Sequence, residues 1–130
     1  MHGKGLNLRE IECGNAEGAL LCVDAGDPAM PAIAIAAGVH GDEPAGPWAL
    51  LELIETGALD RSFCYRIWPC VNASGLIAGT RANANGVDIN RTFDGIGASR
   101  EASAVLAANR GLKFVLSLDL HEDYDAKGFY

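Results

Sequence analysis

Runs of apolar residues along the chain predict an alternation of strands and helices. Three runs have the length of strands and are bounded by glycine or proline, at residues 19–23, 31–37 and 63–68. The run at 31–37 is apolar throughout rather than alternating, which is typical of a strand buried on both faces in a parallel or mixed sheet. A further short strand is expected at residues 6–11, and a last strand at residues 113–120.

Two helices are predicted among these strands. The first begins near Pro44, because proline is tolerated in the first turn of a helix, and it ends near Gly57. Pro44 also disfavours the α conformation for Glu43, so Glu43 is expected at the helix entry. The second helix opens after Ser99, which is a good N-cap residue. Residues 70–97 show neither helix nor strand periodicity, and a structureless stretch of this length is usually functional.

Strands that alternate with helices indicate an α/β fold. Crossover connections in such chains are right-handed, and they give a mixed, largely parallel sheet flanked by helices. The length of 130 residues suits one domain that buries roughly two-thirds of its unfolded surface. We therefore expect a single α/β domain over residues 1–130.

Charge and composition argue against several classes of function. Ten basic and 17 acidic residues give a formal net charge of −7, which argues against nucleic acid or an anionic membrane as the main partner. The sequence shows neither an apolar run of about 18 residues nor the apolar segment of a signal peptide behind its N-terminus. A cytoplasmic location is therefore expected, and in that compartment the four cysteines are expected to be buried thiols.

Three residues at predicted strand ends are candidate metal ligands. His40 and Glu43 follow the apolar run at 31–37, and His121 follows the run at 113–120. The carboxyl ends of parallel strands lie at the same edge of a sheet, so residues distant in sequence can meet there. Two histidines and one glutamate form the protein ligand set of a catalytic zinc, whose fourth position is open to water or substrate. Taken alone, each of these residues is more often structural than a metal ligand.

The stretch between these strand ends holds further candidates. Arg81, Asn90 and Arg91 lie in a segment rich in asparagine and glycine. The planar guanidinium group of arginine is suited to a carboxylate, although a solvated loop with structural asparagines is the alternative. Asp119 is either a hydrogen-bond partner of a metal ligand or a structural carboxylate at a strand end.

Together, three motifs resemble the zinc carboxypeptidase family, the carboxypeptidase A clan, near its succinylglutamate desuccinylase and aspartoacylase branch. The motifs are His-x-x-Glu at 40–43, Gly-Val-Asp-Ile-Asn-Arg-Thr-Phe at 86–93 and Asp-Leu-His at 119–121. The resemblance implies a zinc carboxypeptidase-like fold with a bound Zn²⁺. The zinc ligands that it implies are His40, Glu43 and His121. It further implies that Asn90 and Arg91 hold a substrate carboxylate and that Arg81 stabilises the oxyanion.

The resemblance covers only the N-terminal part of such an enzyme. The family's general base is a glutamate on a later strand, whereas this sequence ends at Tyr130, nine residues after His121. We therefore expect residues 1–130 to be the N-terminal part of a single catalytic domain, apparently truncated and inactive by itself. Glu122 is a candidate replacement base, although the neighbour of a ligand at a strand end generally points elsewhere.

Three functions remain open on this reasoning. The first is a zinc-dependent hydrolase that cleaves an amide bond next to a free carboxylate, in a small peptide or an N-acyl amino acid. It would be a metallocarboxypeptidase or a deacylase. The second is a non-catalytic metal- or carboxylate-binding module that lacks the general base, and the third is a structural fragment. If strands that normally flank residues 113–120 are absent, the open sheet edge is expected to pair with a second copy of the chain.

Overall fold

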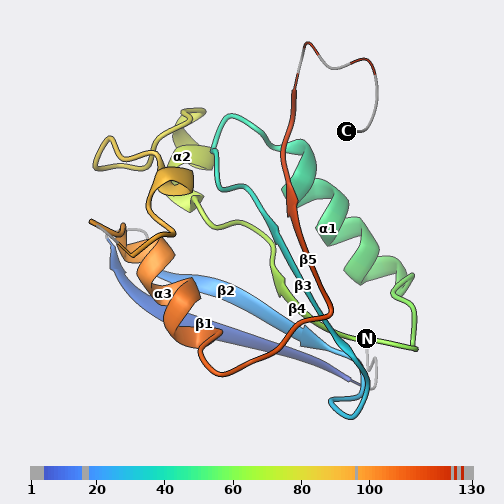
Figure 1. Ribbon diagram of the computed structural model, residues 1–130. Coiled ribbons are helices and arrows are strands. Elements are labelled where there is room, and N and C mark those ends of the chain that lie inside the picture. Colours follow the sequence, from blue (N-terminus) through green and yellow to red (C-terminus); the bar gives the residue numbers. More distant parts are fainter. Residues whose placement is uncertain (1–4, 16–17, 96, 124, 126, 128–130) are drawn as a thin grey trace.

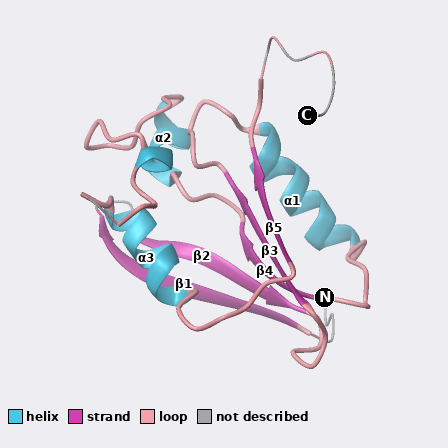
Figure 2. Ribbon diagram, in the orientation of Figure 1, coloured by secondary structure: helices cyan, strands magenta, loops and turns pink. Residues whose placement is uncertain are grey.

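In the part of the chain that the structure describes, five strands form one mixed sheet in the order β1-β2-β4-β3-β5 (Figures 1 and 2). The structure, a computed structural model, describes residues 5–15, 18–95, 97–123, 125 and 127, so Tyr130 lies outside the described residues. The strands are β1 (Leu6–Asn15), β2 (Gly18–Ala25), β3 (Ala32–Ala37), β4 (Cys64–Trp68) and β5 (Leu116–Leu120). β2 pairs antiparallel with β1 and β4, whereas β3 runs parallel to both β4 and β5.

Helices cover both faces of this sheet. The helices in the described residues are α1 (Ala45–Thr56), α2 (Ala73–Ala78), the 3-10 helix η1 (Ile89–Arg91) and α3 (Arg100–Ala108). Figure 1 shows α1 on one side of the sheet and α3 on the other, which gives three layers. Among the helices that the structure describes, none has both the length and the apolar character needed to cross a membrane. The expected α/β class with a mixed sheet flanked by helices is confirmed.

Each face of the sheet has its own apolar core. Under α3, Ala102 and Val105 pack with residues of β1 and β2 and with Trp68 and Ile89. Under α1, Leu50 packs against a second group of buried residues, which consists of Val23, Ala25, Ile33, Ile35, Ala37, Tyr65 and Ile67. β3 alternates between buried and half-buried positions, so the apolar run at 31–37 is fully buried on one face only. The other face carries small alanine side chains, which leave the strand partly accessible.

Two sequence expectations about secondary structure were wrong. The stretch 70–97 contains α2 and η1, which are too short to produce a periodic pattern. α2 begins where the Asn72 side chain accepts a hydrogen bond from the Gly75 N–H at 2.9 Å, so a cap rather than periodicity marks it. The last strand begins at Leu116, which pairs with Ile33 of β3, instead of at residue 113. The other predicted strands match β1 to β4, although β1 extends further, to Asn15.

A large cavity lies at the amino ends of the parallel strands. It has a volume of about 670 Å³, and Met30, Phe114 and Val115 are among its lining residues. None of the candidate ligands or arginines singled out from the sequence lines this cavity. The candidate chemistry therefore lies at the other end of the sheet, where β3 and β5 end.

Candidate metal centre

The turn after β3 holds His40 and Glu43 in buried positions, with 3% and 8% of their surface exposed. The Glu43 N–H donates to the His40 carbonyl oxygen at 3.3 Å, which closes the turn. Between them, Gly41 packs so tightly against α2 that an added Cβ would lie 2.0 Å from the carbonyl carbon of Gly75. α1 then begins at Ala45, with Pro44 as its N-cap residue rather than inside its first turn. Glu43 precedes the helix, as expected from the proline that follows it.

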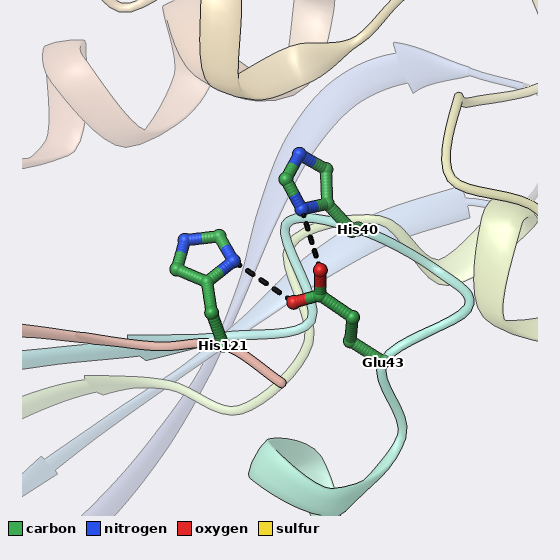
Figure 3. Close-up of side chains that lie close together, drawn as sticks. All are labelled: His40, Glu43 and His121. Atoms are coloured by element: carbon green, nitrogen blue, oxygen red, sulfur yellow. Dashed lines mark hydrogen bonds and ion pairs between the residues drawn. The ribbon is translucent and has the colours of Figure 1, made fainter. Parts of the chain in front are cut away.

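His121 reaches the same place from the end of β5. The parallel ladder sets Ala37 opposite Leu120, so the chain segments after β3 and β5 emerge side by side. Nδ1 of His40 lies 2.9 Å from Oε1 of Glu43, and Nδ1 of His121 lies 2.9 Å from Oε2 of the same carboxylate (Figure 3). One donor atom from each of the three residues lies within 4.8 Å of the others. The structure thus brings together the three residues that the sequence singled out.

A second carboxylate contacts the far nitrogen of each imidazole ring. Nε2 of His40 lies 3.1 Å from Oδ1 of Asp88, and Nε2 of His121 lies 3.0 Å from Oδ2 of Asp119. Asp88 also accepts a hydrogen bond from Nε of Arg81 at 3.1 Å. Burial raises the pKa of Asp88, but its bonds with Arg81 and His40 bring it below its ordinary value. Carboxylates in this position orient the imidazole rings of metal sites and make them better ligands.

The central carboxylate of Glu43 is held in its ionised form. Burial raises the pKa of Glu43, but hydrogen bonds from the Glu122 N–H and from both histidines outweigh burial and lower it. For His121, burial lowers the pKa, and the carboxylates of Glu43 and Asp119 raise it by more. The carboxylates of the cluster therefore surround the two imidazole rings with negative charge.

The donor set fits a divalent cation. A neutral imidazole carries one N–H, so each histidine can donate to only one of the two carboxylates that it contacts. A cation between the two Nδ1 atoms and Glu43 would leave the Nε2–H groups to donate to Asp88 and Asp119. Three carboxylates face one guanidinium group, so the cluster has an excess of negative charge that a cation would neutralise. Nitrogen and carboxylate donors in this number suit zinc.

Buried amide side chains fix the loop that carries Arg81 and Asp88. Nδ2 of Asn72 donates to the carbonyl oxygen of Arg81 at 3.1 Å. Oδ1 of Asn83 accepts from the Val87 N–H at 3.0 Å. Nδ2 of Asn83 donates to the buried Glu101 carboxylate of α3 at 3.2 Å. The backbone on both sides of the loop is therefore tied to α2 and α3.

Asn90 and Arg91 lie in η1, directly after Asp88. Oδ1 of Asp88 accepts a hydrogen bond from the Asn90 N–H at 3.1 Å, so η1 begins at the carboxylate that contacts His40. Arg91 is exposed. Among the described residues, neither the Asn90 nor the Arg91 side chain forms a hydrogen bond or ion pair with His40, Glu43 or His121, so their role in carboxylate binding stays a prediction.

Sequence reasoning missed Asp88 and the role of Glu122. Asp88 stands in the same motif as Asn90 and Arg91, and an acidic residue two positions before that pair was an available signal. The Glu122 side chain accepts a hydrogen bond from the Ala45 N–H at 3.1 Å. Its carboxylate is thus used at the start of α1, and no local sequence pattern indicates this partner.

The fold places the chain in the class of carboxypeptidase-like folds, and its donor set could hold a metal ion. Within that class, the chain belongs to the succinylglutamate desuccinylase/aspartoacylase family, because the model of that family's catalytic domain matches residues 29–129. The resemblance seen in the sequence motifs is thereby confirmed.

Solved structures share this fold but are longer than the chain. A protein from Burkholderia mallei ATCC 23344 named as a carboxypeptidase has a TM-score of 0.81 and 26% identity, over 96% of this chain and 37% of that one. A protein from Shewanella amazonensis SB2B named as a metallopeptidase has a TM-score of 0.75 and 28% identity, over 91% of this chain and 50% of that one. An aspartoacylase family protein from Mesorhizobium loti has a TM-score of 0.73 and 24% identity, over 92% of this chain and 41% of that one, and this likeness concerns the fold alone. No curated protein sequence matches the chain. The chain thus spans half or less of the length of these structures.

Proposed function

We propose that the chain carries the zinc site of a hydrolase that cleaves an amide bond next to a free carboxylate. The substrate would be a small peptide or an N-acyl amino acid. The observation that supports this most is the convergence of His40, Glu43 and His121 at one strand edge in a member of this family. When bound, a zinc ion supplies Lewis acidity, which polarises a carbonyl and makes water a stronger acid.

The arginines of the loop would bind and stabilise the substrate in this proposal. Arg91 and Asn90 would hold the free carboxylate, since guanidinium groups form paired hydrogen bonds with carboxylates. Arg81 is held by Asp88 at 3.1 Å, and Asp88 in turn contacts His40, which keeps the guanidinium close to the cluster. From there Arg81 would stabilise the negative charge that develops on the carbonyl oxygen.

A non-catalytic metal- or carboxylate-binding module is the second candidate. It is favoured because the carboxylates of two glutamates at the site already accept hydrogen bonds or contact the histidines. Glu43 contacts both histidines, and Glu122 accepts from the Ala45 N–H. Amide cleavage also needs a proton delivered to the leaving nitrogen, and such acid–base help typically accelerates a reaction by about 10²–10⁴. Neither glutamate is free for this task, so on this second proposal the chain binds its ligand without hydrolysing it.

Binding of an N-acyl amino acid to the zinc-loaded chain tests both candidates at once. Calorimetry should show tighter binding of an N-acetyl amino acid than of the same compound with its carboxylate converted to a primary amide. Arg91→Lys should weaken binding of the acid by about tenfold, because lysine lacks the paired donors of arginine. Binding of the amide should stay unchanged.

Arg61→Lys is the matched control, because Arg61 is an exposed arginine that precedes β4 at the opposite end of the parallel strands. This variant should bind both compounds like the wild type. Equal affinity of the wild type for acid and amide would contradict the carboxylate site. If chromatography detects release of the free amino acid, the result would favour the hydrolase over the binding module.

A further inference from the structure

Helix α1 begins without a cap from its own sequence neighbours. Its N-cap residue is Pro44, which makes no side-chain hydrogen bond, and its first turn contains no acidic residue. The first residues of a helix leave their N–H groups without partners inside the helix. Pro47 has no N–H, and the Trp48 N–H donates to the Pro44 carbonyl oxygen. The amides of Ala45 and Gly46 are therefore the ones that need acceptors from elsewhere.

A residue 77 positions further along the chain supplies one of these acceptors. Oε2 of Glu122 accepts a hydrogen bond from the Ala45 N–H at 3.1 Å. A carboxylate at this position also interacts favourably with the positive end of the helix dipole. The contact ties the segment after β5 to the first turn of α1.

The backbone of the same residue contacts the central carboxylate of the cluster. The Glu122 N–H donates to Oε2 of Glu43 at 3.1 Å, and this is the oxygen that lies 2.9 Å from Nδ1 of His121. Glu122 thus makes two hydrogen bonds to the segment 43–45, one through its side chain and one through its backbone. Together they fix the place at which His121 meets Glu43.

We propose that Glu122 is a positioning residue of the metal centre, which holds the His121 end of β5 against the segment that carries His40 and Glu43. The proposal rests on the proposed zinc site. It gives Glu122 a task other than proton transfer, because its carboxylate is used on the α1 amide. Such a tie matters most on this side of the centre, because β5 is an edge strand paired only with β3 in the described sheet.

Zinc affinity and amide exchange together test the proposal. In the 130-residue chain, Glu122→Ala should weaken zinc binding by about tenfold, as expected when a residue that orients a metal ligand is lost. Affinity is measured by competition with a chromophoric chelator. Exchange of the Ala45 amide with deuterium, followed by NMR in the metal-free protein, should become faster. Glu122→Gln keeps a side-chain oxygen that can accept the hydrogen bond, so it should restore both values close to those of the wild type.

Asp60→Ala is the matched control for charge and stability. Oδ1 of Asp60 accepts from the Ser62 N–H at 2.8 Å, and the residue precedes β4 at the far end of the parallel strands. Its loss removes one charge and one carboxylate-to-backbone bond, and it should leave zinc affinity unchanged. An unchanged zinc affinity in Glu122→Ala would overturn the proposal, as would an equal loss in Asp60→Ala. A wild-type chain that does not bind zinc would remove the proposed function itself, and this inference with it.

Discussion

The two arms of the candidate metal centre are held in different ways. The inner arm, residues 38–43, lies between β3 and α2, and its His40 side chain is 4% exposed. The edge arm, residues 119–122, begins in the last two residues of the edge strand β5, and the His121 side chain is 30% exposed. Packing and a closed turn fix the inner arm, whereas hydrogen bonds to the inner arm fix the edge arm. Substitutions in the inner arm should therefore change folding and metal binding together, and those in the edge arm should change metal binding alone.

Loss of either histidine should have the largest effect, because each arm supplies a proposed zinc ligand that the other arm cannot replace. His40→Ala and His121→Ala should each weaken zinc binding by more than about 100-fold, which exceeds the usual loss for outer partners of a ligand. Mass spectrometry gives the zinc content of the purified chains, and competition with a chelator gives their zinc affinity. Full occupancy in both variants would remove the metal-site interpretation.

Gly41→Ala should have the next largest effect, because it disturbs the inner arm by contact alone. The added Cβ would lie 2.0 Å from the carbonyl carbon of Gly75, so the turn and α2 must separate. We expect a loss of about 2–3 kcal/mol in the free energy of unfolding, as for other overpacked sites. Urea denaturation measures it.

Gly57→Ala is the control for Gly41→Ala. Nothing lies within 4 Å of an added Cβ at Gly57, but its φ of +66° is unfavourable for alanine. A loss of about 1 kcal/mol is expected there. A Gly41→Ala loss no larger than this would show that the inner arm is not packed as described.

The stability of the metal-free histidine variants sharpens the comparison between the arms. His40→Ala removes a buried ring and leaves the Asp88 carboxylate without that partner, so a loss of about 2 kcal/mol is expected. His121→Ala changes a partly exposed ring, and its effect should stay within about 0.5 kcal/mol. Urea denaturation in the presence of a chelator gives both values. Equal losses would contradict the distinction between the arms.

The smallest effect expected is weak self-association through the open side of the edge arm's strand. Unpaired backbone groups of an edge strand favour pairing with another chain, and lysine on such a strand prevents it. Leu118 of β5 is 43% exposed. Light scattering at high protein concentration should show association of the wild type that Leu118→Lys abolishes.

Leu106→Lys is the matched control for Leu118→Lys. Leu106 lies on α3 and is 42% exposed, so the two substitutions remove similar amounts of exposed apolar surface. Leu106→Lys should associate like the wild type. A wild type that stays monomeric at all concentrations would contradict the edge-pairing prediction.

Local signals in the sequence predicted most of the elements and the meeting of the two arms. Apolar runs marked β2, β3 and β4 because strand length and flanking glycines or prolines are visible locally. Gly57 and Ser99 marked helix ends, and both cap their helices in the structure. His40, Glu43 and His121 could be singled out because residues at parallel strand ends share one edge of the sheet.

The remaining contacts could not be predicted because they join residues far apart in the sequence. Asp88 meets His40 across 48 residues, and Glu122 meets Ala45 across 77 residues. α2 owes its place to Asn72 and to the close approach of Gly75 to Gly41, which no single segment encodes. Such contacts depend on the packing of elements whose positions are not known in advance.

The distance along the chain between the two arms determines when the centre can form. Glu43 and His121 are 78 residues apart, and they meet only after β5 has paired with β3. Closing so large a loop costs conformational entropy before its contacts offset that cost, so pairings of this kind slow folding. The β1–β2 hairpin needs no such closure. During refolding, the chain should therefore form this hairpin before it can take up zinc, and the appearance of zinc binding should mark the docking of its last strand.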